Sequence, residues 1–374
     1  MKKEYDYLFI LGGIPYYDRI GGINKVIFLL SKFLNDKNYK VAIVFITGHI
    51  NQVAKINNIN FKTKINKIEL ITNNSLLFIF LKHYFKNKFN NSLDNIDVYP
   101  NIRYLKKINS KRIISPWWWG IILSEYYNKK NKYFIIYHNY DDPVEIQRYK
   151  NKSEDFKKLI IKSYEISNKI AASKHVYERF INENIPLIKE GIDLNRYITN
   201  TEPENKKNFT IMMPLRAEDL KGAKYGIDAL KLIHDKIENI EIETFGNYRG
   251  NIPNFINHRG YVQISDLKEM YKKSRIFILP SIEEGIPEPL IEAMINGCAA
   301  VSTTSGGPSE IIENYVNGIL VPIKDPYAIA SAVIYLYNNK DKLLEMAKKG
   351  ILKAKEYDIK NTYGDFLRAI KHYE

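Results

Sequence analysis

Short apolar runs alternate with helical stretches along the whole chain, and this alternation constrains the fold more than any other feature. Residues 6–11 form an apolar run, a loop with Gly21-Gly22 follows, and apolar residues then recur at helical spacing from Val26 to Leu34. Such alternation is typical of an α/β fold with a parallel sheet. In this half, further strands are expected at residues 41–46, 112–114, 134–137 and 169–172.

The alternation restarts after residues 182–208, a segment broken by prolines and a glycine that we interpret as a linker. We expect two doubly wound α/β domains, residues 1–190 and 191–355, with a terminal helix at 356–374 that packs back on the first. Ligands of such sheets bind beyond the carboxyl ends of the strands, which favours a cleft between the domains. In the second half, strands are expected at 209–213, 240–245, 276–279, 299–302 and 319–321, and helices at 223–234, 265–273, 289–296, from Pro308 and from Pro326.

Composition narrows the class of protein. Cys298 is the single cysteine of the chain, so a disulfide framework is excluded and a reducing compartment is expected. Glu4 and Asp6 stand where a signal peptide has no acids, and no stretch approaches the ~20 apolar residues that span a bilayer. We therefore expect a cytoplasmic protein that at most lies peripherally on the inner face of a membrane.

Positive charge is concentrated in the first half. The net charge is +14, and residues 51–132 contain 15 basic and 4 acidic residues interleaved with aromatic ones. This block either contacts an anionic partner such as a membrane surface, or reflects a composition rich in Lys, Asn and Ile. Residues 75–89 also allow two interpretations. They form either a helix that lies on a membrane surface or an ordinary helix that packs its apolar face on the sheet. At least one residue of Trp117-Trp118-Trp119 is expected to line an acceptor cleft or to touch a membrane interface.

The largest concentration of residues that could bind or react with a ligand lies in residues 279–294. A strand ends there, a loop follows, and Pro289 begins a helix whose amino end suits a phosphate. Glu284 and Glu292 can both face that end, and a carboxylate beside an anion site binds hydroxyl groups. A sugar nucleotide offers both groups, whereas the alternative is that the glutamates only favour a helix start.

A second loop follows the strand at 209–213 and contains Arg216 and Lys221. These two cations could clamp a diphosphate, or could be solvated surface charges. Gly306-Gly307 forms a further glycine turn that enters a helix.

The order and spacing of these residues resemble the retaining GT-B glycosyltransferases of the glycosyltransferase 4 type, also described as glycosyl transferases group 1. Glu284 and Glu292, separated by seven residues, resemble the paired glutamates of that family, and Arg216 with Lys221-Gly222 resembles its Arg and Lys-Gly motif. His138 resembles a histidine near the reacting sugar. Further matches in family order are Gly21-Gly22, Gly191-Ile192-Asp193 with Tyr197, Gly246, Arg259-Gly260-Tyr261, Leu279-Pro280-Ser281, Gly306-Gly307 with Glu310, and Asn317-Gly318.

The resemblance implies a GT-B fold, in which two Rossmann-like domains face each other across a cleft. It also implies transfer of a hexose from a UDP- or GDP-sugar, UDP slightly preferred, to a glycan or lipid-linked acceptor with retention of configuration. Polysaccharide or glycolipid biosynthesis is the expected setting. No cofactor and no divalent metal are expected, and no nucleic acid is expected as a partner.

The resemblance also assigns roles to residues. Arg216 and Lys221 would bind the donor diphosphate, Glu292 the ribose hydroxyls and Glu284 the hexose, while His138 would orient the sugar. His138, Glu284, Arg216 and Lys221 form the predicted catalytic set. The predicted donor site further includes Gly21, Gly22, Gly246, Tyr261, Gly285, Ile286, Pro287 and Leu290.

Three residues depart from the family pattern in positions that bear on the donor. Because of them, the resemblance does not identify the nucleotide base or the transferred sugar. Leu215 and Tyr248 stand where the family has glycines, and Pro287 removes one N–H group from the expected hexose pocket. Two other functions remain possible from the sequence. One is another GT-B enzyme, a sugar-nucleotide epimerase or a phosphorylase, and the other is a basic nucleic-acid-binding protein that uses residues 51–132.

Overall fold

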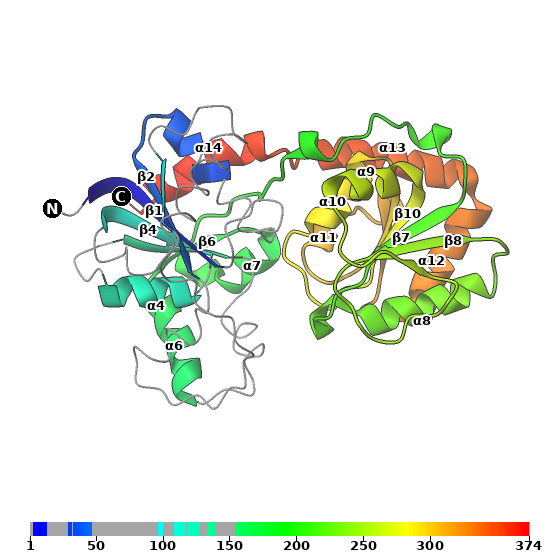
Figure 1. The fold of residues 1–374 in the computed structure, drawn as a ribbon, viewed down its shortest axis with the longest axis horizontal. Helices are drawn as coiled ribbons and strands as arrows, with labels where there is room; N and C mark the ends of the chain where they lie inside the picture. Colours follow the sequence, from blue (N-terminus) through cyan, green and yellow to red (C-terminus); the bar gives the residue numbers. More distant parts are fainter. Residues whose placement is uncertain are drawn as a thin grey trace, which may run out of the picture. The chain divides into compact units, whose positions relative to one another are not determined.

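The computed structural model of the chain describes residues 3–12, 29–31, 33–46, 96–99, 108–116, 118–127, 133–138 and 154–373. The chain divides into two compact units, drawn in Figure 1. Unit 1 comprises residues 1–172, 176–188 and 363–374, and unit 2 comprises residues 173–175 and 189–362. The chain therefore passes from unit 1 to unit 2 and returns to unit 1 near its end.

Unit 1 contains a parallel sheet of six strands in the order β3-β2-β1-β4-β5-β6. This order is that of a Rossmann fold, in which the sequence of strands reverses direction between β1 and β4. The strands are β1 (Lys3–Gly12), β2 (Val41–Ile46), β3 (Ile96–Tyr99), β4 (Ile108–Ser115), β5 (Tyr133–His138) and β6 (Asn168–Ala171), and the helices include α4 (Trp118–Tyr127), α6 (Glu154–Glu165) and α7 (Lys174–Arg179).

Two tryptophans fill the core of unit 1. Trp118 and Trp119, at the start of α4, are each 2% exposed and pack in one cluster with Ile10 of β1 and Ile113 of β4. Both side chains therefore serve packing, although the sequence favoured one tryptophan in an acceptor cleft. Trp117, the third of the run, lies outside the described residues.

The end of the chain packs in unit 1. Phe366 of α14 (Ile359–Lys371) is fully buried and stacks on Phe9 of β1, with 6.5 Å between the ring centroids. The rings of Tyr363 and Phe33 stack at 4.4 Å. The crossing back to unit 1 falls after residue 362, later than the expected residue 355, because Ile359 N still donates a 2.9 Å hydrogen bond to a carbonyl of unit 2.

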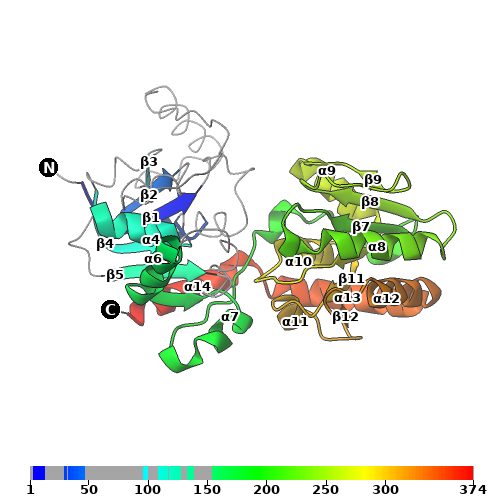
Figure 2. The same ribbon diagram turned by 90° about the horizontal axis from the view of Figure 1, so that it is seen from below.

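Unit 2 repeats the architecture. Its six strands are parallel in the order β12-β11-β10-β7-β8-β9, again with a reversal, here between β7 and β10. Figure 2 shows β7, β8 and β9 on one side of this sheet and β11 and β12 on the other. The strands are β7 (Thr210–Pro214), β8 (Glu241–Phe245), β9 (Asn257–His258), β10 (Ser274–Leu279), β11 (Ala299–Thr303) and β12 (Gly318–Val321). The α-helices are α8 (Ala223–His234), α9 (Ile264–Lys273), α10 (Glu288–Ile295), α11 (Pro308–Ile311), α12 (Pro326–Asn338) and α13 (Lys340–Lys355).

Helices cover both faces of this sheet. One apolar cluster joins α8 and α12 to the sheet, and another joins α9, α10 and α11 to its opposite face, as Figure 1 shows. Fully buried strand residues such as Ile211, Phe277 and Val301 explain the continuous apolar runs in the sequence, because both faces of a parallel sheet are covered.

The expected elements of the second half agree with the structure to within one or two residues. The α/β class with two Rossmann-like domains is confirmed. In the expected linker, short 3₁₀ helices occur at η3 (Ile181–Glu183), η4 (Leu194–Arg196) and η5 (Pro203–Asn205). Within the described ranges, each helix is too short or too polar to cross a bilayer.

Candidate functional site

The loops that follow β7 and β10 meet where the strand order of unit 2 reverses. Ile282 N donates a 2.8 Å hydrogen bond to Leu220 O, which joins the two loops directly. Gly222 adopts φ +65°, and a Cβ at this position would lie 1.9 Å from Pro280 O. Glycine is therefore required for the approach, which brings together the carboxyl ends of the two strands where doubly wound sheets bind ligands.

An ion pair links the two loops at this point. Lys221 ends η6 (Asp219–Lys221), and its Nζ lies 2.8 Å from Glu284 Oε2. The other carboxylate oxygen, Glu284 Oε1, accepts a 2.9 Å hydrogen bond from Ser281 Oγ. The side chains of Lys221 and Glu284 are 20% and 11% exposed, so the charges are partly removed from water and oriented by their partners.

The loop after β11 is hydrogen-bonded to the backbone of Glu284. Glu284 N donates to Ser305 O at 2.7 Å, and Gly307 N donates to Glu284 O at 3.0 Å. A Cβ on Gly307 would lie 1.5 Å from Gly285 O. The Gly306-Gly307 turn thus lets a third strand end pack against the loop that contains Glu284.

Glu292 is buried beside two phenol groups. It lies on α10, is 4% exposed, and accepts a 2.8 Å hydrogen bond from the Tyr271 hydroxyl through Oε2. Tyr197 is also buried, and its pKa is raised by burial and by the negative charges of Glu292 and Glu288. The carboxylate of Glu292 is thus buried and accepts a hydrogen bond from a neutral, buried donor.

The other residues predicted for the donor site differ in their exposure and in the loop to which they belong. Arg216 follows β7 and is exposed, and Tyr261 is 63% exposed. Gly246 follows β8 with φ +127°, and a Cβ there would lie 2.1 Å from Leu215 O, so glycine is required. The remaining four, Gly285, Ile286, Pro287 and Leu290, are Gly and apolar residues buried in the loop before α10 and in its first turn.

This arrangement lies in a segment with a recognisable sequence. Residues 196–353 match the sequence model of the family described as glycosyl transferases group 1. The chain contains a glycosyl transferases group 1 domain. The matched range includes Lys221, Glu284 and Glu292 and covers most of unit 2.

Two curated relatives are similar to part of this chain. The uncharacterized glycosyltransferase MJ1607 of Methanocaldococcus jannaschii is 26% identical over 228 residues, which are 53% of this chain and 58% of MJ1607. The amylovoran biosynthesis glycosyltransferase AmsK of Erwinia amylovora is 26% identical over 171 residues, which are 41% of this chain and 42% of AmsK. The chain thus spans 58% of the first relative and 42% of the second.

A solved structure resembles this chain over nearly its whole length. Anabaena HepE in complex with UDP-glucose has a TM-score of 0.68 at 14% identity, and the match covers 98% of this chain and 99% of HepE. At this identity the likeness establishes the fold. The fold that contains the group 1 domain is therefore GT-B.

The predicted site residues outside the group 1 domain belong to unit 1. His138 is the last residue of β5 and pairs in register with Ala171 of β6. Gly21 and Gly22 lie outside the described residues, as does most of the basic block at 51–132. No cluster of three or more His, Cys, Asp and Glu residues able to hold a metal occurs in the part of the chain that the structure describes.

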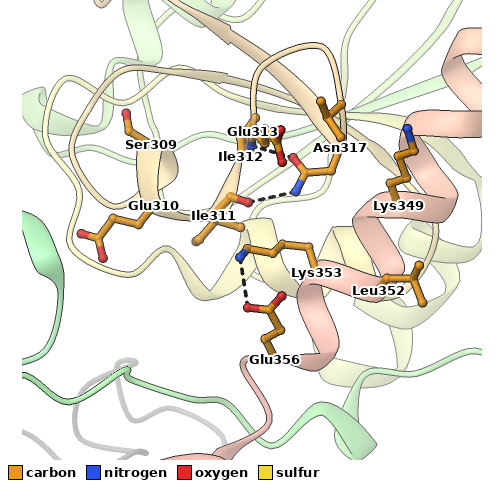
Figure 3. Close-up of a pocket in the computed structure, with 11 residues that line it drawn as sticks. Ser309, Glu310, Ile311, Ile312, Glu313, Asn317, Lys349, Leu352, Lys353 and Glu356 are labelled. Carbon is orange, nitrogen blue, oxygen red and sulfur yellow. Dashed lines mark hydrogen bonds and ion pairs between the residues drawn. The ribbon is translucent and has the colours of Figure 1, made fainter.

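A pocket of about 520 Å³ lies elsewhere on the group 1 domain (Figure 3). Residues of α11, of the loop 312–317 and of α13 line it, and Lys221, Glu284 and Glu292 do not. Lys353 of this pocket pairs with Glu356 at 3.0 Å, and Lys349 pairs with Glu345 at 2.7 Å. The pocket is thus distinct from the predicted donor residues of the domain.

Sequence reasoning missed the tyrosine that supports Glu292. Tyr271 lies on the apolar face of α9 with Leu267 and Met270, so its spacing indicates a core residue. Its ring is indeed in the core, and only its hydroxyl reaches Glu292, 21 positions away. The contact between the Tyr271 hydroxyl and a carboxylate of the next helix does not change the spacing of apolar residues along α9. It therefore cannot be predicted from that spacing.

Proposed function

We propose that this chain is a retaining glycosyltransferase that moves a hexose from a nucleotide sugar to a glycan or lipid-linked acceptor. The observation that carries the proposal is the Lys221–Glu284 ion pair at the strand reversal of the group 1 domain, with buried Glu292 on the adjoining helix. A cation and two carboxylates at such a point fit a ligand that combines phosphates with hydroxyl groups.

In this proposal the donor lies across the loops after β7 and β10. The amino end of α10 and the cations Arg216 and Lys221 bind the diphosphate, because backbone N–H groups and positive charge both favour an anion there. Lys221 has three N–H donors, so its bond to Glu284 is compatible with a phosphate contact. Glu284 binds hexose hydroxyls, and Glu292 binds those of the ribose.

The same cations serve the reaction. As the bond to the sugar breaks, negative charge develops on the leaving nucleoside diphosphate, and positive groups already in place stabilise it without reorganisation. We propose that these side chains do so without a divalent metal. A phosphate oxygen of the leaving group takes the proton of the acceptor hydroxyl on the same face, which retains configuration, and His138 orients the sugar.

The similar proteins favour a particular class of donor and of acceptor. The HepE structure contains UDP-glucose, and AmsK is named for the biosynthesis of a polysaccharide, amylovoran. We therefore prefer a UDP-sugar over a GDP-sugar, and a growing glycan or lipid-linked glycan as acceptor. With a lipid-linked acceptor the protein would work in the cytoplasm at the inner face of the membrane.

A ligand screen tests the proposal. Thermal shift and sugar release are measured with UDP, GDP, ADP and their common sugar conjugates, with and without Mg²⁺. We expect one nucleoside diphosphate to stabilise the protein without metal, and its sugar conjugate to be slowly hydrolysed. If every nucleotide leaves the melting temperature unchanged, the proposed donor site is wrong.

Replacing Lys221 by alanine tests its role in the site. Losing a hydrogen bond to a charged group should weaken binding of the nucleoside diphosphate by about 10- to 100-fold. Lys224, an exposed lysine in the first turn of α8, provides the matched control, since Lys224→Ala removes the same charge. Equal affinities of the two variants in calorimetric titrations would contradict a direct contact of Lys221 with the diphosphate.

A further inference from the structure

We propose that Tyr271 and Tyr197 are positioning residues that orient the Glu292 carboxylate toward the ribose, so that the site selects ribonucleotides over 2′-deoxyribonucleotides. This inference rests on the proposed function, in which Glu292 binds ribose hydroxyls. It adds two residues from outside the predicted site, one on α9 and one just after η4.

The Glu292 carboxylate needs neighbours to define its orientation. The last torsion of a glutamate side chain is broad, so an unsupported carboxylate rotates among several directions. Here Oε2 accepts a hydrogen bond from the Tyr271 hydroxyl at 2.8 Å, and the buried phenol of Tyr197 lies close enough that the charge of Glu292 raises its pKa. Neighbours on two different elements therefore restrict the carboxylate, and with it the directions in which it can accept further hydrogen bonds.

Both phenols remain donors over the whole working range of pH. Burial, followed by the negative charge of Glu292, raises the pKa of Tyr271 well above its usual value of 10.0. The same two causes raise the pKa of Tyr197. Neither hydroxyl loses its proton at neutral pH, so the Tyr271 hydroxyl remains a donor to Glu292 there.

The tyrosines are themselves fixed by their surroundings. The Tyr271 side chain has no exposed surface, and its backbone carbonyl accepts a 3.1 Å hydrogen bond from the buried ammonium of Lys206. Tyr197 is 3% exposed, and its N–H donates to Leu194 O at 3.0 Å, which closes η4. The phenols thus act as rigid supports for Glu292.

An oriented acceptor distinguishes ligands by their hydroxyl groups. When a site is built to hydrogen-bond a hydroxyl, an analogue without it leaves a buried polar group unpaired and binds poorly. Ribose presents a 2′-hydroxyl and deoxyribose does not. Selection between them should therefore depend on the tyrosines that aim Glu292.

The test compares UDP with 2′-deoxy-UDP, and GDP with 2′-deoxy-GDP, by calorimetric titration of the full chain. We expect the wild type to bind its preferred ribonucleotide at least about tenfold more tightly than the deoxy form. In Tyr271→Phe the affinity for the ribonucleotide should fall about tenfold while that for the deoxynucleotide changes little, so the ratio approaches one. For the donor sugar, KM should rise more than kcat falls.

Control variants separate positioning from general loss of structure. Tyr357→Phe removes the hydroxyl of another buried tyrosine, which donates to Glu310 O at 3.4 Å, and should leave the ratio unchanged. Tyr197→Phe should reduce the ratio, and provides a second variant if Tyr271→Phe does not fold. In a Glu292→Gln background, Tyr271→Phe should have no further effect on the ratio.

The outcomes distinguish this inference from the proposed function. Equal weakening of ribo- and deoxynucleotide in Tyr271→Phe and Tyr197→Phe, or a wild type without preference, would overturn the positioning role while leaving a nucleotide site. A wild type that binds no nucleoside diphosphate would overturn the proposed function, and this inference with it.

Discussion

Two glycines of unit 2 share a backbone conformation but differ in their surroundings. Gly222 has φ +65° and Gly260 has φ +61°, both in the left-handed region. A Cβ on Gly222 would lie 1.9 Å from Pro280 O, whereas a Cβ on Gly260 would have no atom within 4 Å. Comparing the two positions separates two reasons for glycine. The backbone conformation favours glycine at both positions, and the close approach of two loops requires it only at Gly222.

Alanine at each position measures the two effects. We expect Gly260→Ala to lower the free energy of unfolding by about 1–2 kcal/mol, the cost of the left-handed conformation. Gly222→Ala should cost about 1–3 kcal/mol more, because the loops after β7 and β10 must separate. Urea unfolding of both variants measures the difference, and equal losses would mean that the loops adjust without strain.

At the residue scale, the sequence predicts Glu284 and Glu292 as donor-site residues from their spacing and from the helix that begins between them. It does not predict that Ser281 and Tyr271 hydrogen-bond these carboxylates, because a contact made by the tip of a side chain leaves no pattern in the chain. Lys221 was predicted as a phosphate ligand, and its pairing with Glu284, 63 positions away, depends on the fold.

At the scale of elements, the carboxyl end of α9 is closed by a buried lysine. Lys206 Nζ donates to Tyr271 O at 3.1 Å and to Ser274 O at 2.6 Å, and the side chain is fully enclosed beside Cys298. A cation at this end of a helix satisfies carbonyl groups that have no partner within the helix. Burial nevertheless lowers the pKa of the Lys206 ammonium below its ordinary value of 10.5.

This lowered pKa predicts a dependence of stability on pH. Between the pKa in the folded state and 10.5, the unfolded chain binds the proton and the folded chain does not, so stability rises with pH in that range. The rise should be absent in Lys206→Met. Urea unfolding from about pH 7 to 10.5 tests this, with Cys298→Ala in both proteins so that the thiol does not titrate. Parallel pH curves would contradict it.

Element boundaries were predicted well where the apolar pattern is long. The helix expected at 223–234 coincides with α8, since its buried residues recur every three or four positions. β9 was missed because it has only two residues, too few to show a period, and β3 was missed because Asp97 interrupts its short apolar run. The helix expected from Pro289 begins one residue earlier, at Glu288, with Pro289 in its first turn.

At the scale of the whole molecule, residues 363–374, which include most of α14, belong to a unit whose other residues are far away in sequence. Phe366 is fully buried against Phe9, which is 357 positions earlier. Phe366→Ala should lower the free energy of unfolding of unit 1 by about 3–5 kcal/mol, because it leaves a cavity in its core. Unit 2 should be unaffected. Hydrogen exchange resolved along the chain can separate the units, and equal losses of protection in both would contradict this assignment.

The return of the chain to unit 1 has a consequence for biosynthesis. Domains usually fold in the order in which they leave the ribosome, the amino-terminal one first. Here residues 189–362 form unit 2 almost entirely by themselves, while unit 1 lacks α14 until residues 363–374 are made. At ~5–20 residues per second, roughly 10 to 40 s separate the synthesis of residue 188 from that of residue 374. During translation the first half therefore waits as an incomplete fold, and the later half is the first to finish.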